Sequence, residues 1–329
     1  QNQGFPEFVT VAAPLPSRRP PMTLPAPSRT LHGVLFVIAA VALFACFDAG
    51  VKVASAIAPV GLVVWARYLF QGGFTAVTVL PRRGPALLRT GRPGLQLLRG
   101  LSLLALSVTA FFSLKVMPVG EFTAIVMLTP LLITLLATLT LGERISALRW
   151  ALLAGGLLGA LVVIRPKGDA HDLGWAALLP VGLVVSNALF QLITSRLARS
   201  EDPATTHFYT GLTGAVLTSA VLPWSWQMLS PAGWALLVLL GMLSSSGHFL
   251  LILGYMRAGA ALLTPFLYFQ IVFATLVGWL WFGHAPDATT LTGIAIITGC
   301  GALGTWLANR EQRAPAPTPA PLPKPTCTA

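Results

Sequence analysis

The sequence has little charge for its length. Asp, Glu, Lys and Arg make up 9% of its 329 residues, and only 10 residues are acidic. In a soluble domain about 25% of the residues are charged, whereas here 55% are hydrophobic. Because so few charged side chains cannot cover a surface that faces water, the composition excludes an ordinary soluble protein and indicates an integral membrane protein.

Cysteine is nearly absent, and the motifs of several enzyme classes are missing. The three cysteines, Cys46, Cys300 and Cys327, stand far apart, so the sequence has neither a disulfide framework nor a metal-binding spacing. It contains no HExxH motif and no GxxxxGK loop followed by Ser or Thr. We therefore expect a protein that is not an enzyme, holds no cofactor or metal, and takes its energy from a gradient or from the substrate itself rather than from ATP.

The basic residues predict a membrane orientation rather than a nucleic-acid site. The net charge is +11, but Lys and Arg fall singly between apolar runs and form no patch with interleaved aromatic residues. If both termini lie on one side, that side collects roughly sixteen of the 21 Lys and Arg residues, Arg99 among them. The opposite loops hold Lys52, Lys115, Arg165 and Lys167. The positive-inside rule then predicts cytoplasmic termini.

Ten apolar runs are candidates for membrane-spanning helices, each of which needs about 20 apolar residues to cross a ~30 Å hydrocarbon core. Short connections with Pro, Gly or Asp separate most of them, as at Ala58-Pro59 and Met117-Pro118. The pattern predicts an all-α integral membrane protein with ten transmembrane helices. The runs cover residues 31–54, 60–80, 95–114, 119–141, 147–165, 174–196, 205–223, 233–253, 259–282 and 289–308.

Polar residues recur at matching positions in the two halves of the chain, at an offset of about 140 residues. The matched pairs are Asp48 with Asn187, Lys52 with Gln191, Ser107 with His248, Thr123 with Thr264, Met127 with Tyr268, and Thr134 with Thr275. Because each copy has five helices, an odd number, the second copy must enter the membrane from the opposite side. The halves are therefore predicted to be inverted repeats.

The domain boundaries follow from this repeat. We expect the first repeat at 31–166 and the second at 174–308, with Pro-rich, disordered cytoplasmic tails at 1–30 and 309–329. Inverted repeats are typical of secondary transporters, whose substrate site lies near the membrane midplane at the repeat interface.

The ends of both halves resemble the EamA-type permeases of the drug/metabolite transporter superfamily. The residues that carry the resemblance are Leu141-Gly142-Glu143-Arg144-Ile145, Trp150 and Gly155 to Gly159, then Thr264-Pro265-Phe266-Leu267-Tyr268 and Phe282-Gly283-His284, and also Asp48, Lys52 and Arg67. His284 departs from the family, which usually has a glutamate there. The resemblance implies a central cavity lined mainly by the first, third, fourth, sixth, eighth and ninth helices. It also implies substrates among amino acids, vitamins, nucleotide-related cofactors and drugs.

Asp48 and Arg67 are the ionisable residues most clearly inside the hydrocarbon region. Both lie ~10 Å below the same membrane face, at 1.5 Å per helical residue. A charge inside the membrane costs at least ~2.5–3.5 kcal/mol, so we expect the two to pair. The pair is either a structural link between two helices or a contact for substrate or coupling ion. Lys52 either shares the carboxylate or extends its ammonium group to the interface.

His248 and several polar or aromatic residues are further candidates. His248 either relays protons or is a neutral histidine hydrogen-bonded between helices. A stripe that includes Asn187 and Gln191 either lines the cavity or joins helices. The predicted cavity residues are Phe47, Asp48, Ser107, Phe111, Thr123, Met127, Asn187, Phe190, Gln191, Ser244, His248, Thr264 and Tyr268, and the candidates for ion coupling or ion pairing are Asp48, Lys52, Arg67 and His248.

Small residues in the runs 147–165 and 289–308 predict close helix packing. Residues 299–304 match the dinucleotide-binding pattern GxGxxG, but they lie inside an apolar run rather than after a strand, so we reject a dinucleotide site. Glycine lets helices approach each other within a chain or between subunits. A homo-oligomer through these two helices is therefore a prediction.

We expect a secondary transporter of the bacterial inner membrane that moves small amphipathic metabolites across the bilayer by alternating access. The first predicted activity is the export of amino acids, including aromatic ones. The alternative is the uptake or exchange of a vitamin or nucleotide-like cofactor of the riboflavin or S-adenosylmethionine type, and the sequence hardly separates the two. An intramembrane enzyme is a remote alternative, and a passive channel is disfavoured because no ring of like charges lines a candidate pore.

Overall fold

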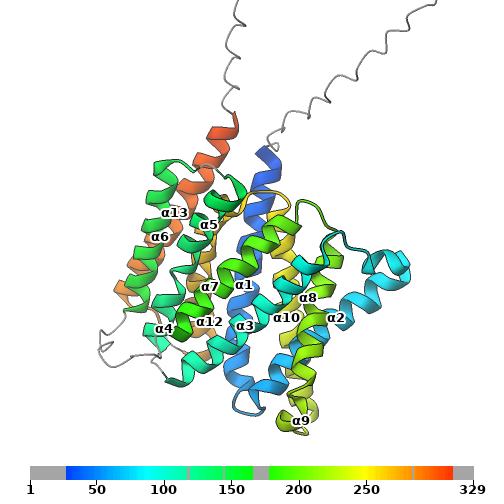
Figure 1. Ribbon diagram of the computed structural model, residues 1–329. Coiled ribbons are helices and arrows are strands. Elements are labelled where there is room, and N and C mark those ends of the chain that lie inside the picture. Colours follow the sequence, from blue (N-terminus) through cyan, green and yellow to red (C-terminus); the bar gives the residue numbers. More distant parts are fainter. Residues whose placement is uncertain (1–26, 117–118, 144, 166–177, 284, 314–329) are drawn as a thin grey trace, which may run out of the picture.

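The structure is a computed structural model that describes residues 27–116, 119–143, 145–165, 178–283 and 285–313 (Figure 1). Every regular element in these ranges is a helix. The first half contains α1 Pro27–Ala54, α2 Val60–Arg83, the 3-10 helix η1 Gly84–Leu88, α3 Pro93–Val116, α4 Val119–Val126, α5 Thr129–Leu141 and α6 Ala147–Ile164. The second half contains α7 Leu178–Leu197, α8 Pro203–Ser219, α9 Leu222–Ser225, α10 Pro231–Tyr255, α11 Ala260–Leu263, η4 Thr264–Tyr268, α12 Phe269–Phe282 and α13 Ala288–Arg313.

The predicted all-helical membrane fold is confirmed. Among the described residues, 7 helices are long and apolar enough to cross a membrane, and Thr129–Leu141 is a shorter apolar helix. All ten predicted runs contain helix, but α2 and α8 are neither among the 7 long apolar helices nor the shorter apolar helix. The count of ten spans is therefore confirmed only in part. Large side chains such as Val77, Leu139 and Trp281 are exposed on the outside, as lipid-facing residues are.

Two of the predicted runs are interrupted rather than continuous. Pro130 follows the break between α4 and α5, and Pro265 lies in the 3-10 turn η4 between α11 and α12. Proline removes a backbone donor and its ring clashes with the preceding turn, so each run is divided there. The main chain at the first break bonds to the second run, because the hydroxyl of Tyr268 donates to the carbonyl oxygen of Met127 (3.2 Å).

The helix packing has the symmetry expected of two repeats. Helix α1 packs on α10 and α12, and its counterpart α7 packs on the corresponding helices α3 and α5. Two further pairs, α2 with α8 and α6 with α13, join a helix to its own counterpart. In the first of these, a Cβ built on Gly211 would lie 2.3 Å from the backbone nitrogen of Gly72, so the two backbones touch. An axis relating the repeats therefore passes between such pairs.

The glycines on which the oligomer prediction rested are used within one chain. Helix α6 packs along α13, and a Cβ on Gly159 would lie 2.9 Å from the carbonyl oxygen of Gly293. The close approach expected from these residues is confirmed, but it joins the last helix of each repeat. It gives no support to an association between subunits.

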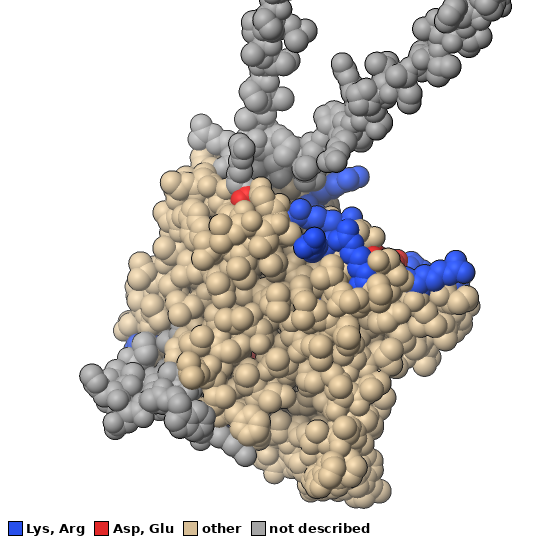
Figure 2. Space-filling model, viewed as in Figure 1, with Lys and Arg blue, Asp and Glu red and all other residues tan. Residues whose placement is uncertain are grey.

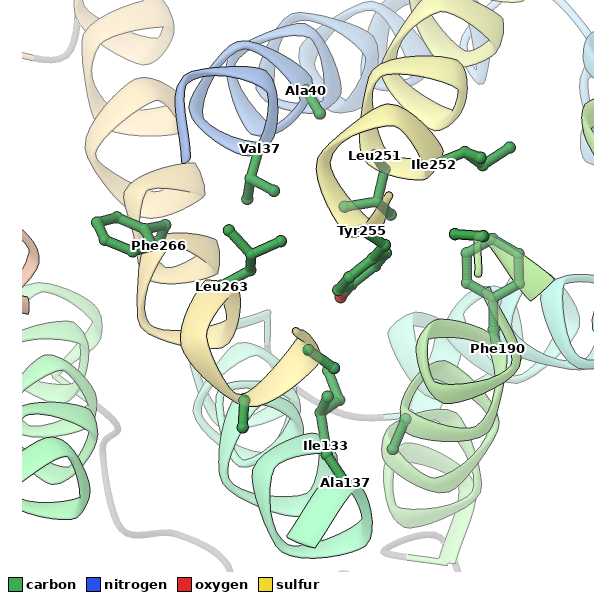
Figure 3. Close-up of a cluster of buried hydrophobic side chains, with 14 of the residues drawn as sticks. Val37, Ala40, Ile133, Ala137, Phe190, Leu251, Ile252, Tyr255, Leu263 and Phe266 are labelled. Atoms are coloured by element: carbon green, nitrogen blue, oxygen red, sulfur yellow. The ribbon is translucent and has the colours of Figure 1, made fainter. Parts of the chain in front are cut away.

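The two ends of the bundle differ. Helix α1 begins and α13 ends at the same end, here called the termini end (Figure 1). A buried apolar cluster packs the helices together in that half, and its residues include Val37, Ile133, Phe190, Leu251, Tyr255 and Leu263 (Figure 3). Lys and Arg side chains also gather toward the termini end on the face shown in Figure 2.

Candidate functional site

Asp48 and Arg67 are close to the same turn of α1 but do not form the ion pair that was predicted. The exposed carboxylate of Asp48 accepts a hydrogen bond from the amide of Gln270 on α12 (2.8 Å). Arg67 is buried on α2, and its Nη2 donates to the hydroxyl of Ser107 on α3 (2.9 Å). The pairing prediction was wrong because it used depth alone, whereas the two side chains point toward different helices.

The cations at this site lie against aromatic rings. The guanidinium carbon of Arg67 is 5.6 Å from the centroid of the Phe47 ring and 4.5 Å from that of Tyr68. Lys52 does not share the Asp48 carboxylate; its Nζ lies 4.7 Å from the centroid of the Phe282 ring. Contacts of this kind stabilise a positive charge by about 0.5–2 kcal/mol. They do not neutralise it.

His248 lies at the meeting point of three helices. Its ring on α10 is 4.8 Å from the ring of Phe44 on α1 and 5.5 Å from that of Phe190 on α7. The predicted neighbours Ser244, Leu251 and Tyr255 are buried on the same helix. Within the described part of the chain, neither Nδ1 of His248 nor the hydroxyl of Ser244 has a hydrogen-bond partner. The hydrogen bond between helices that one interpretation required is therefore missing at Nδ1.

The stripe on α7 is a connected polar row. The amide of Gln191 donates to the side-chain oxygen of Asn187 (3.2 Å), and Gln191 accepts a hydrogen bond from the hydroxyl of Tyr255 on α10. This contact links α7 to α10. The stripe was predicted either to line the cavity or to join helices, and at Gln191 it joins helices.

The remaining candidates lie on the fourth and ninth predicted runs and on α3. The hydroxyls of Thr134 and Thr264 are hydrogen-bonded to each other (2.7 Å), and Tyr268 bonds to Met127 as described above. Thr123 is half-buried on α4. On α3, Phe111 packs edge-on against Phe112, with 5.5 Å between ring centroids.

Arg99 is a residue whose place the sequence analysis got wrong. It was counted with the cytoplasmic charges, yet its side chain is fully buried. It donates to the hydroxyls of Thr194 (2.8 Å) and Thr210 and to the carbonyl oxygen of Thr206 (3.2 Å), and its guanidinium carbon is 4.5 Å from the ring centroid of Phe190. Its position inside the run 95–114 was the available signal, because a loop arginine would precede that run.

A buried histidine on α8 was also missed. The carbonyl oxygen of Ser245 only accepts, so Nε2 of His207 carries the proton that it donates there (3.0 Å). Nδ1 lies 2.8 Å from the hydroxyl of Thr75, which also bonds to the carbonyl oxygen of Gln71 (2.7 Å). His207 thereby ties α8 to α10 and α2. The signal in the sequence was a polar group, Thr205-Thr206-His207, within an apolar run.

Glu143 joins the two halves at the termini end. Its carboxylate accepts hydrogen bonds from the backbone nitrogens of Ala260 (3.3 Å) and Ala261 (2.9 Å) and from Arg199. A Cβ on Gly259 would lie 2.8 Å from a carboxylate oxygen of Glu143, so only glycine fits there without a shift. Its counterpart position, His284, lies outside the described residues.

Comparison with known proteins identifies the family. A model described as the EamA-like transporter family matches residues 31–165 and again residues 174–307. This chain belongs to the EamA-like transporter family. The resemblance noted in the sequence is thereby confirmed, and the EamA-like repeat occurs twice in the chain. Membership makes it a multi-pass membrane protein of a bacterial transporter family, with a small-molecule substrate and the lipid bilayer as its surroundings.

Several curated proteins are similar to this EamA-like chain over most of their length. A riboflavin transporter of Rhizobium johnstonii is 34% identical over 256 residues, which are 75% of this chain and 82% of that protein. An S-adenosylmethionine uptake transporter of Rickettsia felis is 29% identical, covering 69% and 78%. A pseudopaline exporter of Pseudomonas aeruginosa is 29% identical, covering 82% and 95%. These names indicate transporters rather than enzymes.

A solved crystal structure has the same fold. It covers 84% of the EamA-like chain and 99% of its own chain, with a TM-score of 0.74 and 23% sequence identity. At this identity the likeness concerns the arrangement of the helices alone.

Proposed function

We propose that this EamA-like permease carries a vitamin or nucleotide-like cofactor, of the riboflavin or S-adenosylmethionine type, across the bacterial inner membrane by alternating access. Two of the relatives compared above are named for such compounds, at 34% and 29% identity. They favour the alternative given in the sequence analysis over the export of amino acids. Homo-oligomerisation is not part of the proposal, because the glycines that suggested it pack within the chain.

One observation carries the proposal: incompletely satisfied polar groups stand among aromatic rings at membrane depth. Arg67 lies against Phe47, and His248 lies between Phe44 and Phe190. Ionisable groups inside a membrane mark a functional site by default because of their cost. Binding sites for small molecules combine apolar and aromatic walls with a few fixed polar groups, which suits a planar heteroaromatic ring with polar substituents.

The asymmetry of the two ends supports an outward-facing state with cytoplasmic termini. The termini end is closed by the apolar cluster and by Glu143, while Asp48 in the other half of α1 is exposed. The arginines that end α2 and α7, Arg82, Arg83 and Arg196, agree with a cytoplasmic termini end under the positive-inside rule. Rocking of one repeat against the other then exposes the site to the cytoplasm.

Transport by the purified protein in liposomes tests the proposal. Uptake of radiolabelled riboflavin, S-adenosylmethionine, tryptophan and leucine is measured over a range of concentrations, with empty liposomes as the control. We expect saturable transport of riboflavin or S-adenosylmethionine and none of the amino acids. Saturable transport of amino acids alone would restore the first prediction, and flux proportional to concentration would indicate a channel.

A further inference from the structure

Asp48 and Arg67 each keep hydrogen-bonding capacity that the described part of the chain does not use. Asp48 has one described partner, the neutral amide of Gln270, and no cation within ion-pairing distance among those residues. Arg67 has five N–H donors, and its one described hydrogen bond goes to the neutral hydroxyl of Ser107. Both charges are therefore held in place by neutral groups.

The guanidinium of Arg67 offers a specific geometry to a ligand. Its Nε is buried and has no hydrogen-bond partner among the described residues, which is unfavourable for a charged donor. The side chain is fixed by Ser107 at Nη2 and by the rings of Phe47 and Tyr68, so this donor points in a defined direction. Nε and an adjacent Nη together form the fork that matches the two oxygens of a carboxylate.

The two opposite charges flank a single turn of α1. Phe47, whose ring lies against the guanidinium of Arg67, directly precedes Asp48 in the sequence. The described hydrogen bond of the Asp48 carboxylate comes from the neutral amide of Gln270 on α12, so no direct ion pair uses this carboxylate. A ligand that carries an ammonium and a carboxylate on one carbon atom presents charges complementary to those of Asp48 and Arg67.

We propose that Arg67 and Asp48 are the specificity-determining residues of this site, with Arg67 receiving the carboxylate and Asp48 the ammonium of an amino-acid group on a nucleotide-like cofactor. The inference rests on the proposed function and narrows it. It selects cofactors of the S-adenosylmethionine type, which carry a zwitterionic amino-acid group, over uncharged ones of the riboflavin type. Gln270 is a positioning residue, because it acts on the ligand through Asp48.

Binding to the purified full-length protein in lipid nanodiscs tests the inference. The probes are S-adenosylhomocysteine and 5′-methylthioadenosine, which share the adenosine thioether but differ in the amino-acid group, together with S-adenosylmethionine and riboflavin. We expect both zwitterionic probes to bind about tenfold or more tightly than 5′-methylthioadenosine, as a charge-assisted hydrogen bond predicts. Arg67→Gln and Asp48→Asn should remove this preference, so that the ratio of the affinities for S-adenosylhomocysteine and 5′-methylthioadenosine falls to about one.

Two variants provide the controls. Arg83→Gln removes an exposed arginine from the same helix, which pairs with Asp202 (2.7 Å), and should keep the tenfold preference. Arg67→Lys keeps the positive charge but lacks the two adjacent N–H donors of the guanidinium. This variant should retain part of the preference for the zwitterionic probes. If the Gln and Asn variants fail to fold, the ligand series on the unmodified protein still decides.

The outcomes separate the inference from the proposed function. Equal affinity of the unmodified protein for S-adenosylhomocysteine and 5′-methylthioadenosine, or binding of riboflavin alone, overturns the inference and leaves the proposed function standing. A preference that survives in folded Arg67→Gln and Asp48→Asn also overturns it. If none of the four compounds binds, the proposed function fails together with it.

Discussion

At the scale of single residues, the Arg165 and Asp287 pair shows how a charge outside the membrane-spanning segments is held. The Asp287 carboxylate accepts from Nη2 of Arg165 (2.5 and 2.7 Å) and from the backbone nitrogen of Thr290 (2.9 Å). The hydrogen bond from Arg165, and then that from the Thr290 backbone, hold the pKa of Asp287 well below its usual range. Both partners are exposed, so solvent screens the pair and its effect on stability is small.

This lowered pKa predicts a pH-dependent difference between the unmodified protein and Asp287→Asn. Because the pKa in the folded state lies below that in the unfolded state, the contribution is complete above about pH 4 and falls as the pH drops toward the folded-state pKa. We expect Asp287→Asn to lower the Tm slightly at pH 7 and the gap to narrow as the pH is lowered below about 4. Thermal melting in detergent at low salt measures both, and a gap that does not change with pH would contradict the assignment.

The sequence located several ionisable residues at membrane depth but not their partners. Asp48, Arg67 and His248 were recognisable because ionisable residues stand out within apolar runs. Their contacts with Gln270, Ser107 and Phe190 depend on the rotation of each helix about its axis, which residue depth does not determine. Arg99 was misplaced because it stands near the start of the run 95–114, where a basic side chain was expected to extend to the membrane surface rather than to pack inward.

At the scale of helices, the connections rich in Pro and Gly located the boundaries well. Helix α2 begins at Val60 directly after Pro59, as the run 60–80 predicted, and α5 ends at Leu141 before Gly142, whose φ of 67° is left-handed. The breaks next to Pro130 and within η4 were not foreseen. Membrane helices tolerate proline when neighbouring groups satisfy the freed backbone, so a proline inside an apolar run does not by itself predict an interruption.

The close approach of α2 and α8 predicts that Gly211→Ala destabilises the protein and that Gly73→Ala does not. The new methyl group at position 211 would meet backbone atoms of Gly72 at 2.3 Å, and backbone cannot move aside as a side chain can. Overpacking of this kind costs about 1–3 kcal/mol. Gly73 has no neighbour within 4 Å, so alanine there should be neutral or stabilise the helix.

Thermal melting of both glycine variants in the same detergent provides the measurement. A Tm for Gly211→Ala equal to that of Gly73→Ala would mean that the two helices are not in backbone contact. Because the two substitutions add the same methyl group to helices of the same pair, differences in helix propensity cancel in the comparison.

At the scale of the whole molecule, the repeat and its inversion followed from the sequence, whereas the conformational state did not. An offset of about 140 residues and an odd number of helices sufficed to predict two inverted copies, and the packing of α1 and α7 on corresponding helices agrees with them. Two such copies predict two related closures of the central site, one at each membrane face. Which closure is present depends on a difference of a few kcal/mol between states, which a symmetric pattern does not encode.

In the proposed alternating-access cycle, Glu143 is expected to hold the termini end closed. Its carboxylate comes from the first repeat, and its partners Arg199, Ala260 and Ala261 come from the second, so opening the termini end must break these hydrogen bonds. Glu143→Ala should therefore shift the population toward the state open at that end. Breaking one charge-assisted contact of about 1.5–3 kcal/mol changes the ratio of the two states about tenfold or more.

A cysteine placed in the closed cluster reports this shift. Ala137 is fully buried within the cluster, and Ala137→Cys in a background without Cys46, Cys300 and Cys327 should react slowly with a soluble maleimide. Adding Glu143→Ala should raise the labelling rate about tenfold, following the population of the open state. Thr140→Ala removes an exposed hydroxyl whose described hydrogen bond goes to the carbonyl oxygen of Leu136 in the same helix, and it should leave the rate unchanged. Equal rates with and without Glu143 would show that the apolar cluster alone keeps the termini end shut.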